Sequence, residues 1–294
     1  MILHKPALLL EVIKGLITDK NGIYVDCTLG HGGHSIALFK KLSLSAKLIG
    51  IDQDKNSLSI AQKRLEAVKN GNAIMIKDNF VNLKKIVQNL QFSSVSGILY
   101  DLGFSAEQIY KAERGFSYQL NAPLDMRMNL ESNLTAAEII NHYSGSELIK
   151  IFKNYGEEKY ADLITRKIIE KRVIKSIQTT FELVNLIREA LPGFALRHKH
   201  PARKIFQALR IAVNNELEVL KQSLLQGIDL LKIGGRIAII SYHSLEDRII
   251  KKTFQSSKSI KILTKSPIVP DTVEQKKNYS SRSAKLRIVE KIHA

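Results

Sequence analysis

The sequence of 294 residues contains one cysteine, Cys27, and no long apolar run. A single cysteine excludes an internal disulfide framework and a cysteine-based zinc cluster, and it fits a reducing compartment. No apolar run approaches the roughly 18 residues that a membrane span needs. Residues 1–6 also lack the charged segment and following apolar stretch of a secretory signal. We therefore expect a cytoplasmic protein with no membrane partner.

Acidic residues are scarce relative to basic ones. The 28 Asp and Glu stand against 45 Lys and Arg, which leaves a formal net charge of +17. Such a charge attracts polyanions, and with no membrane partner expected, nucleic acid is the leading candidate. With 44% hydrophobic residues the chain can bury a large core, so it suits one large α/β domain, alone or with a smaller companion. We find no internal repeat.

The segment from residue 22 to residue 101 alternates short β-branched runs with helical patterns. This alternation is typical of βαβ units and a parallel sheet. The predicted strands are 23–25, 47–51, 73–76 and 97–100, and helical apolar spacing covers 35–42, 57–68 and 83–90. The first third of the chain is therefore predicted to be a Rossmann-like half.

Strand signals disappear between about residues 111 and 200. Three pairs have the spacing of a capping box, and one helix ends at 191–193; the pairs are Thr135 with Glu138, Ser144 with Glu147, and Thr179 with Glu182. We interpret this stretch as an all-helical insert in one sheet. The predicted domains are residues 1–110 and 201–294 for the sheet, and 111–200 for the insert, which we expect to recognise RNA.

The α/β pattern resumes after the insert. A long helical pattern covers about 203–231, and a turn at Gly234 and Gly235 leads into a strand at 236–241. After a helix at about 245–254, two β-prone runs at 260–263 and 285–289 predict an antiparallel pair that closes the sheet. The stretch between these runs is rich in Ser, Lys and Pro and is expected to be mobile.

The first predicted strand ends at Asp26 and leads into a turn that contains Gly30, Gly32 and Gly33. Glycines allow close approach of a ligand and positive φ, and the following helix presents unpaired N–H groups. The spacing is not the G-x-G-x-x-G of a dinucleotide site, so it favours the amino-acid end of S-adenosylmethionine over a pyrophosphate. An ordinary tight turn is the alternative.

Polar and aromatic residues follow the second and third predicted strands. Asp52 lies at the carboxyl edge of the sheet, where a carboxylate can accept hydrogen bonds from two ribose hydroxyls. The alternative is that Asp52 caps the helix near Lys55. Phe80 follows the third strand, where its ring can pack beside an adenine. A phenylalanine at such a place is, however, more often part of the core.

The fourth predicted strand ends at Asp101. In methyltransferases that act on exocyclic amines this place holds an acid or amide followed by Pro-Pro-aromatic, because an acceptor there polarises the N–H groups of a poorly nucleophilic nitrogen. The sequence keeps the acid and the aromatic Phe104 but not the prolines. Asp101 is the predicted catalytic residue, and a cap at the strand end is the alternative.

From Asp101 onward the sequence closely resembles the RsmH (MraW) family of ribosomal RNA small-subunit methyltransferases. The matching blocks run in order along essentially the whole chain. They are DLG at 101–103, Gln108, ERGFSY at 113–118, PLDMRM at 123–128, HKHPA at 198–202, FQALRIAVN at 206–214, ISYHSLEDR at 240–248 and SRSAKLR at 281–287. Small departures from the family pattern are Phe104, Ser105-Ala106 and Asn129, of which only Phe104 lies near the proposed chemistry.

The resemblance implies a Rossmann-like class I S-adenosylmethionine-dependent methyltransferase sheet with an inserted all-helical domain. It implies methyl transfer from S-adenosylmethionine to N4 of cytidine 1402 in the decoding region of 16S rRNA, within the small ribosomal subunit. By motif, the cofactor contacts are Gly32, Gly33, His34, Asp52, Phe80, Asp101 and Gln108. No DNA partner is expected, and the oligomeric state stays open. A DNA amino-methyltransferase, an NAD-dependent oxidoreductase and a non-catalytic ribosome-assembly factor are the alternatives.

Basic residues concentrate at the end of the chain. Residues 248–294 hold 12 Lys and Arg against 3 Asp and Glu, so 12 − 3 gives +9 of the total +17. We interpret this tail as a clamp on the rRNA backbone, with a solvated face as the alternative. A second candidate clamp is Arg166, Lys167, Lys171 and Arg172, expected on one helical face opposite Leu163, Ile164 and Ile168.

Three further motifs leave their roles open. Phe116 and Tyr118 can stack on an unpaired base or anchor the insert to the sheet. The histidine pairs 31/34 and 198/200 lack further ligands at metal-like spacing, so no bound metal is expected. His243 starts a block that can hold RNA, although Ser244 as a helix N-cap explains much of it.

Overall fold

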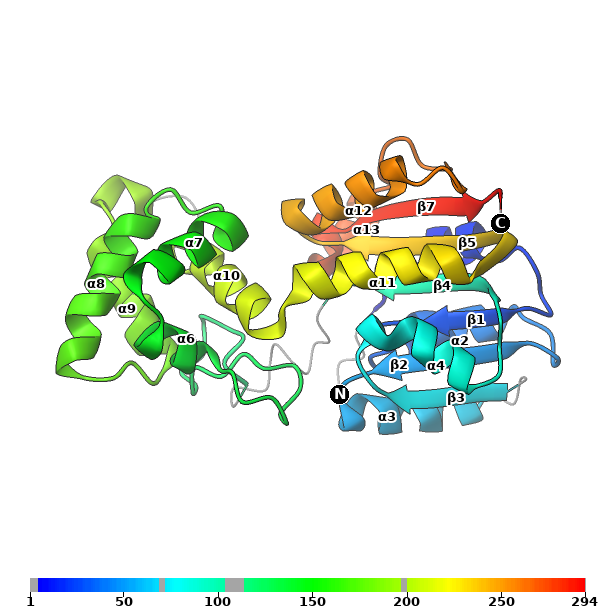
Figure 1. Cartoon of the computed structure of the whole chain (residues 1–294), viewed down its shortest axis with the longest axis horizontal. Helices are drawn as coiled ribbons and strands as arrows, with labels where there is room; N and C mark the ends of the chain where they lie inside the picture. Colours follow the sequence, from blue (N-terminus) through cyan, green and yellow to red (C-terminus); the bar gives the residue numbers. More distant parts are fainter. Residues whose placement is uncertain (1–4, 69–71, 104–113, 197–199, 294) are drawn as a thin grey trace. The chain divides into compact units, whose positions relative to one another are not determined.

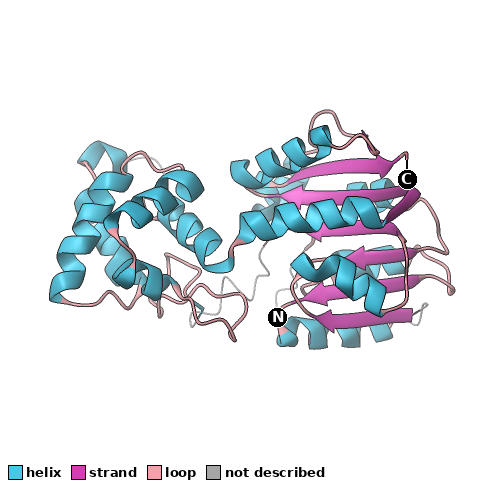
Figure 2. Ribbon diagram, viewed as in Figure 1, coloured by secondary structure: helices cyan, strands magenta, loops and turns pink. Residues whose placement is uncertain are grey.

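The computed structural model of the chain describes residues 5–68, 72–103, 114–196 and 200–293. It divides into two compact units, residues 1–105 with 217–294 and residues 106–216 (Figure 1). The first unit is built on a sheet, and the described part of the second is mainly helical (Figure 2). The helical unit extends beyond the predicted 111–200 because the helix from Arg203 to Asn214 packs into its core.

The sheet has seven strands within the described residues. They lie in the order β3-β2-β1-β4-β5-β7-β6. The strands from β3 to β5 are parallel, and β7 is antiparallel to both β5 and β6. The bounds are β1 (Ile23–Asp26), β2 (Lys47–Asp52), β3 (Asn72–Lys77), β4 (Val95–Asp101), β5 (Leu231–Ser241), β6 (Ile260–Ile262) and β7 (Lys285–Lys291).

Helices cover both faces of this sheet because its buried residues alternate between the faces. On β1, Tyr24 packs in a cluster with α1, α2 and α3, whereas Val25 packs in a cluster with α4, α11 and α12. The helices of this unit are α1 (Leu9–Leu16), α2 (Gly33–Phe39), α3 (Lys55–Glu66), η1 (Phe80–Asn82), α4 (Leu83–Asn89), α11 (Glu216–Leu230), α12 (Ser244–Ser256), α13 (Thr272–Lys277) and η4 (Tyr279–Ser283). The predicted Rossmann-like fold class is confirmed.

The end of the chain is part of the sheet rather than an appendage. The predicted antiparallel pair is confirmed as β6 and β7. The stretch between them was expected to be mobile, but it forms α13 and η4, and Ile268 bridges Leu286 of β7. Gly234 and Gly235 do not precede the strand: β5 begins at Leu231, and Gly234, with φ of 77°, lies where the pairing with β4 is irregular.

The helical unit has its own apolar core. Phe152, Ile164, Leu183 and Leu209 are each completely buried in it and come from four different helices. Two of the three expected capping boxes are complete. At the start of α6 the structure describes only one half of the third box, in which the Thr135 side chain accepts the N–H of Glu138 at 3.1 Å. The elements are α6 (Ala136–His142), α7 (Gly145–Gly156), α8 (Ala161–Ile174), α9 (Thr180–Ala190), η3 (Gly193–Leu196) and α10 (Arg203–Asn214).

The single long helix expected at 203–231 is two helices, α10 and α11. Asn215 separates them with a left-handed φ of 49°, a conformation that asparagine tolerates better than most residues. The side chain of Asn214 donates to the carbonyl of Met126 and accepts the N–H of Met128, so tertiary contacts fix the end of α10. None of the helices in the described part of the chain has the length and apolar character required to cross a lipid bilayer.

Candidate active site

The glycine-rich turn joins β1 to α2 where the strand order of the sheet reverses, with β2 on one side of β1 and β4 on the other. Ligands of open α/β sheets bind outside the carboxyl ends of the strands at such a point. Gly30 and Gly32 have φ of 49° and 76°, which explains the glycines there. A Cβ on Gly33 would lie 3.3 Å from Pro6, so Gly33 permits close approach of the N-terminal segment.

Asp26, at the end of β1, ties the turn together. Its carboxylate accepts the hydroxyl of Ser35 at 2.6 Å and the N–H of Thr28 at 3.1 Å. Burial raises the pKa of Asp26, and the hydrogen bond from Ser35 acts in the opposite direction. The sequence had marked Asp26 only as the end of a strand; the rule that selected Asp52 and Asp101 applies to it equally.

Asp52 connects the end of β2 to the same turn. Its carboxylate accepts the N–H of Gly30 at 2.8 Å and the N–H of Asp54 at 2.9 Å. Burial raises the pKa of Asp52, and these two N–H groups lower it. The N-cap of α3 is Asp54, which accepts the N–H of Asn56 at 2.9 Å. The alternative that Asp52 caps this helix is therefore wrong.

Phe80 begins η1 just after β3 and is half-buried. The side chain of Asn79 caps this short helix by accepting the N–H of Val81 at 2.9 Å. The ring of Phe80 meets that of Tyr100 edge-on, with centroids 5.8 Å apart and planes at 86°. One side of the Phe80 ring thus packs on the core, and the remainder stays accessible at the carboxyl edge of the sheet.

Asp101, at the end of β4, lies between three partners. Its Oδ1 accepts the hydroxyl of Tyr242 at 2.8 Å and the N–H of Gly103 at 3.3 Å, and its Oδ2 lies 3.5 Å from Nδ1 of His34. The backbone N–H of Asp101 donates to Oγ1 of Thr28 at 2.6 Å. The carboxylate accepts a backbone N–H nearby, as a strand-end cap does, but it also faces two side chains from other strands and helices.

His34 is buried, at 5% exposure, in the first turn of α2. Its Nε2 lies 2.9 Å from the carbonyl oxygen of Ala7, which can only accept, so this nitrogen carries a proton. Nδ1 therefore faces Asp101, and this contact is attractive when a proton lies between the two groups. The residue that the resemblance assigned to the cofactor turn is thus also held against the predicted catalytic acid.

Tyr242 is the site residue that the residue-by-residue reasoning missed. It follows the end of β5, the next strand after β4 in the sheet, and its ring lies over Gly103: a Cβ there would come within 2.8 Å of that ring. Burial and the Asp101 carboxylate raise the pKa of Tyr242 far above its usual value. The hydroxyl is therefore protonated and donates to Asp101. The strand-end rule that selected Asp52 and Asp101 identifies Tyr242 when it is applied to the end of β5 as well.

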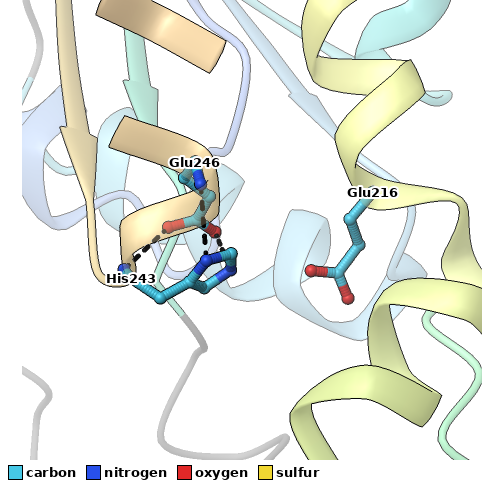
Figure 3. A group of neighbouring side chains, drawn as sticks. All are labelled: Glu216, His243 and Glu246. Atoms are coloured by element: carbon cyan, nitrogen blue, oxygen red, sulfur yellow. Dashed lines mark hydrogen bonds and ion pairs between the residues drawn. The ribbon is translucent and has the colours of Figure 1, made fainter. Parts of the chain in front are cut away.

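The next residue, His243, is the N-cap of α12, so the expectation that Ser244 has this role is wrong (Figure 3). The buried carboxylate of Glu246 accepts the backbone N–H groups of Tyr242 at 2.8 Å and His243 at 3.2 Å. It also lies 3.0 Å from Nε2 of His243. This capping box holds the end of β5 and thereby the backbone of Tyr242.

A cleft in the sheet unit brings several of these residues together. It is lined by Pro6, Asp26, Thr28, Leu29, Gly30, His31, Gly33, His34, Arg64, Asp101 and Gly103. Of the predicted site residues it includes Gly33, His34 and Asp101. Gly32, Asp52 and Phe80 lie outside the lining, although Asp52 is hydrogen-bonded to Gly30 within it. Gln108 and Phe104 lie outside the described residues.

A protein-family model described as the MraW methylase family matches residues 1–292. The chain belongs to the MraW methylase family. A ribosomal RNA small subunit methyltransferase H from Clostridium botulinum (strain 657 / Type Ba4) is 47% identical over 98% of this chain and 99% of its own length. The protein of the same name from Spiroplasma kunkelii is 45% identical over 98% of each. A solved rRNA methylase from Streptococcus thermophilus is 13% identical, with a TM-score of 0.46 and coverage of 100% and 99%.

The resemblance seen in the sequence is thereby confirmed, and with it the prediction of a methyltransferase that uses S-adenosylmethionine. In this MraW methylase, part of the basic tail is structural. Arg287, only 8% exposed, donates to Asp247 at 2.7 Å, and the buried Lys291 donates to the carbonyl of Ile228 at 2.8 Å. The clamp interpretation therefore does not extend to every basic residue after Arg248.

The basic face of α8 differs in part from the expectation. Ile164 and Ile168 are buried, but Leu163 is 37% exposed and does not share their environment. Arg172 donates to the carbonyl of Ile140 at 2.7 Å, so it holds α8 against α6. Lys167 lies 3.7 Å from Glu189, an exposed ion pair of little energetic weight.

The aromatic pair in the ERGFSY block belongs to the helical unit. The ring of Tyr118 stacks on His200, with centroids 4.3 Å apart and planes at 15°, and meets Phe206 edge-on. Phe116 also packs against the core of that unit. His200 therefore covers one face of Tyr118, and both rings anchor the segment to the helical unit rather than to the sheet.

Proposed function

We propose that this MraW methylase transfers a methyl group from S-adenosylmethionine to N4 of a cytidine in small-subunit rRNA, namely cytidine 1402 of 16S rRNA, on the small ribosomal subunit in the cytoplasm. The observation that carries the proposal is the similarity along 98% of the chain to proteins named ribosomal RNA small subunit methyltransferase H. The acid at the end of β4 supports an exocyclic amine as the acceptor, because that chemistry requires a positioned hydrogen-bond acceptor.

The side chains and backbone groups at the switch point fit S-adenosylmethionine. The N–H of Gly32 closes the turn by donating to the carbonyl of Leu29 at 2.8 Å, so the backbone N–H groups available for a carboxylate are those of the first turn of α2, which begins at Gly33 and contains His34. Asp52 supplies a carboxylate for a ribose diol, and the accessible side of Phe80 suits an adenine. When bound, S-adenosylmethionine supplies an activated methyl group.

Asp101 is the residue that we assign to the target amine. Tyr242 and Gly103 occupy Oδ1, so Oδ2 is the oxygen that can accept an N–H of the cytosine amino group. This contact withdraws the N–H proton and makes the nitrogen more nucleophilic. Because methylation of an amine releases one proton, Asp101 with His34 beside it at 3.5 Å can hold that proton as it leaves. Catalysis then rests chiefly on position and electrostatics.

The target base has to leave its stack before its amino group reaches such a cleft. We propose that the helical unit, predicted as residues 111–200, contributes to recognition of the RNA. Its support is the exposed basic residues of α8, since phosphate contacts supply most of the affinity for nucleic acid. We assign no base contact to this unit.

Nucleoside mass spectrometry of small-subunit rRNA tests the proposal directly. We expect N4-methylcytidine at the target position in rRNA from cells that contain the protein and its loss in cells that lack it. Purified protein with labelled S-adenosylmethionine should then methylate small subunits isolated from the deficient cells, whereas the Asp101→Ala variant should do so much more slowly. Undiminished methylation in the deficient cells would instead favour a non-catalytic assembly factor, and labelling of DNA would favour a DNA amino-methyltransferase.

A further inference from the structure

The segment from α13 to η4 is fastened to the N-terminal residues beside the active-site cleft. The carboxylate of Glu274 accepts the N–H of Leu8 at 2.8 Å, and the side-chain amide of Asn278 donates to the carbonyl of Lys5 at 2.9 Å. Lys5 directly precedes Pro6, which lines the cleft. Tyr279 therefore directly follows Asn278, which is hydrogen-bonded to the residue next to the rim of the cleft.

Tyr279 is 75% exposed although its backbone is fixed. Ser281 is completely buried, and its hydroxyl and N–H both donate to the carbonyl of Asn278, at 2.8 and 3.0 Å. The guanidinium carbon of Arg282 lies 4.0 Å from the centre of the Tyr279 ring. A large aromatic ring is thus presented to solvent on a rigid turn, with a cation covering one of its faces and the other face open to a ligand.

Positive charge surrounds this ring. Lys276, Lys277 and Arg282 are exposed, and none of them makes an ion pair with a residue that the structure describes. Lys5 is also exposed, and no acidic residue occurs from Gln275 to Val289. Arg287 and Lys291 of the same tail are engaged within the fold, with Asp247 and with the carbonyl of Ile228, whereas Lys276, Lys277 and Arg282 close to Tyr279 in the sequence stay exposed.

We propose that Tyr279, backed by Arg282, is a stacking platform for an unpaired nucleotide of the RNA substrate next to the target cytidine, with the neighbouring lysines on its phosphates. The inference rests on the proposed function, since it takes RNA as the substrate. Exposed aromatic rings within a basic surface are the means by which proteins hold single-stranded nucleic acid. The guanidinium of Arg282 holds the ring in place because it is attracted to the quadrupole of the face that it covers.

Methylation kinetics of two full-length variants test the platform on small subunits from deficient cells. Base stacking on one aromatic ring is worth roughly a tenfold or greater change in affinity. We therefore expect Tyr279→Ala to raise the KM for subunits about tenfold, with kcat and the affinity for S-adenosylhomocysteine unchanged, and Tyr279→Phe to behave as wild type. A KM for Tyr279→Ala within twofold of wild type, or a Phe variant as impaired as the Ala variant, overturns the platform.

Binding to a single-stranded oligouridylate separates this inference from the proposed function, because it needs no methyl transfer. Tyr279→Ala should weaken binding about tenfold at every salt concentration. Lys277→Gln, which removes a proposed phosphate contact, should lower the slope of log affinity against log salt by about 0.7, the value for one phosphate contact on a single strand. Lys41→Gln is the matched control, because it removes an exposed positive charge that lies after the C-terminus of α2 and outside the proposed platform. Equal slopes for Lys277→Gln and Lys41→Gln, or unweakened binding by Tyr279→Ala, contradict the inference even if methylation itself is confirmed.

Discussion

Replacing Tyr242 with phenylalanine removes one hydroxyl group and leaves the ring over Gly103 in place. The lost contact is the 2.8 Å hydrogen bond to Oδ1 of Asp101. A hydrogen bond to a charged group contributes about 1.5–3 kcal/mol. Because about 1.4 kcal/mol corresponds to a tenfold change in rate, kcat/KM should fall about 10- to 150-fold if Tyr242 positions Asp101 for the reaction.

Two assays on Tyr242→Phe separate the roles of Asp101. A lower kcat with unchanged affinity for S-adenosylhomocysteine means that Asp101 acts on the amine, whereas weaker affinity means that it holds the methionine end of the cofactor. The same substitution on the Asp101→Ala background should have no further effect, since Tyr242 then has no carboxylate to position. An additive loss in the double variant, or kcat and affinity both within twofold of wild type in the single variant, would refute this reasoning.

The control for this experiment is Tyr24→Phe. The hydroxyl of Tyr24 is completely buried at the amino-terminal end of the sheet, where it donates to the carbonyl of Asp19 at 2.8 Å. Its removal leaves the backbone N–H groups of Thr18 and Asp19 without this acceptor, so we expect a loss of about 1–3 kcal/mol in the free energy of unfolding. The kinetic constants should stay at wild-type values, which separates general destabilisation from a role in the site.

Three further substitutions test the cofactor site, the capping box of α9 and the ion pair between Arg287 and Asp247. Asp52→Ala should weaken S-adenosylhomocysteine binding at least tenfold in calorimetry, because the diol loses its acceptor; an unchanged affinity would remove Asp52 from the site. Glu182 has its pKa lowered from 4.5 to about 2 by the N–H of Gln178, so it stabilises the helical unit above pH 4.5, and this contribution is lost as the pH falls towards 2. Glu182→Gln should therefore cost about 1 kcal/mol in urea unfolding at pH 7 and nothing near pH 2, and a constant difference would contradict the assignment. Asp247→Ala should cost about 3 kcal/mol because it leaves the buried Arg287 without its partner, and a loss below about 1 kcal/mol would show that water or another group compensates the charge.

Local periodicity made much of the sheet predictable. The first four strands and the antiparallel pair at the end were found from short β-branched runs, because each strand is defined by residues close together in the sequence. The rule that parallel strands meet at one edge then selected Asp52 and Asp101 as candidates. The same local signals failed at Asn215, where a left-handed residue divides one helical pattern into two helices, and at His243, which replaces Ser244 as the N-cap.

The sequence by itself determined the family and fold class and marked the strand ends where the chemistry was to be sought. Only the tertiary structure decided what surrounds Asp101. Tyr242 lies 141 residues further along the chain, and it reaches Asp101 because β5 pairs with β4 in parallel register, while His34 reaches it from α2. The physical reason is that periodicity depends on neighbours in sequence, whereas these contacts depend on the order in which the strands assemble and on the helices packed against them.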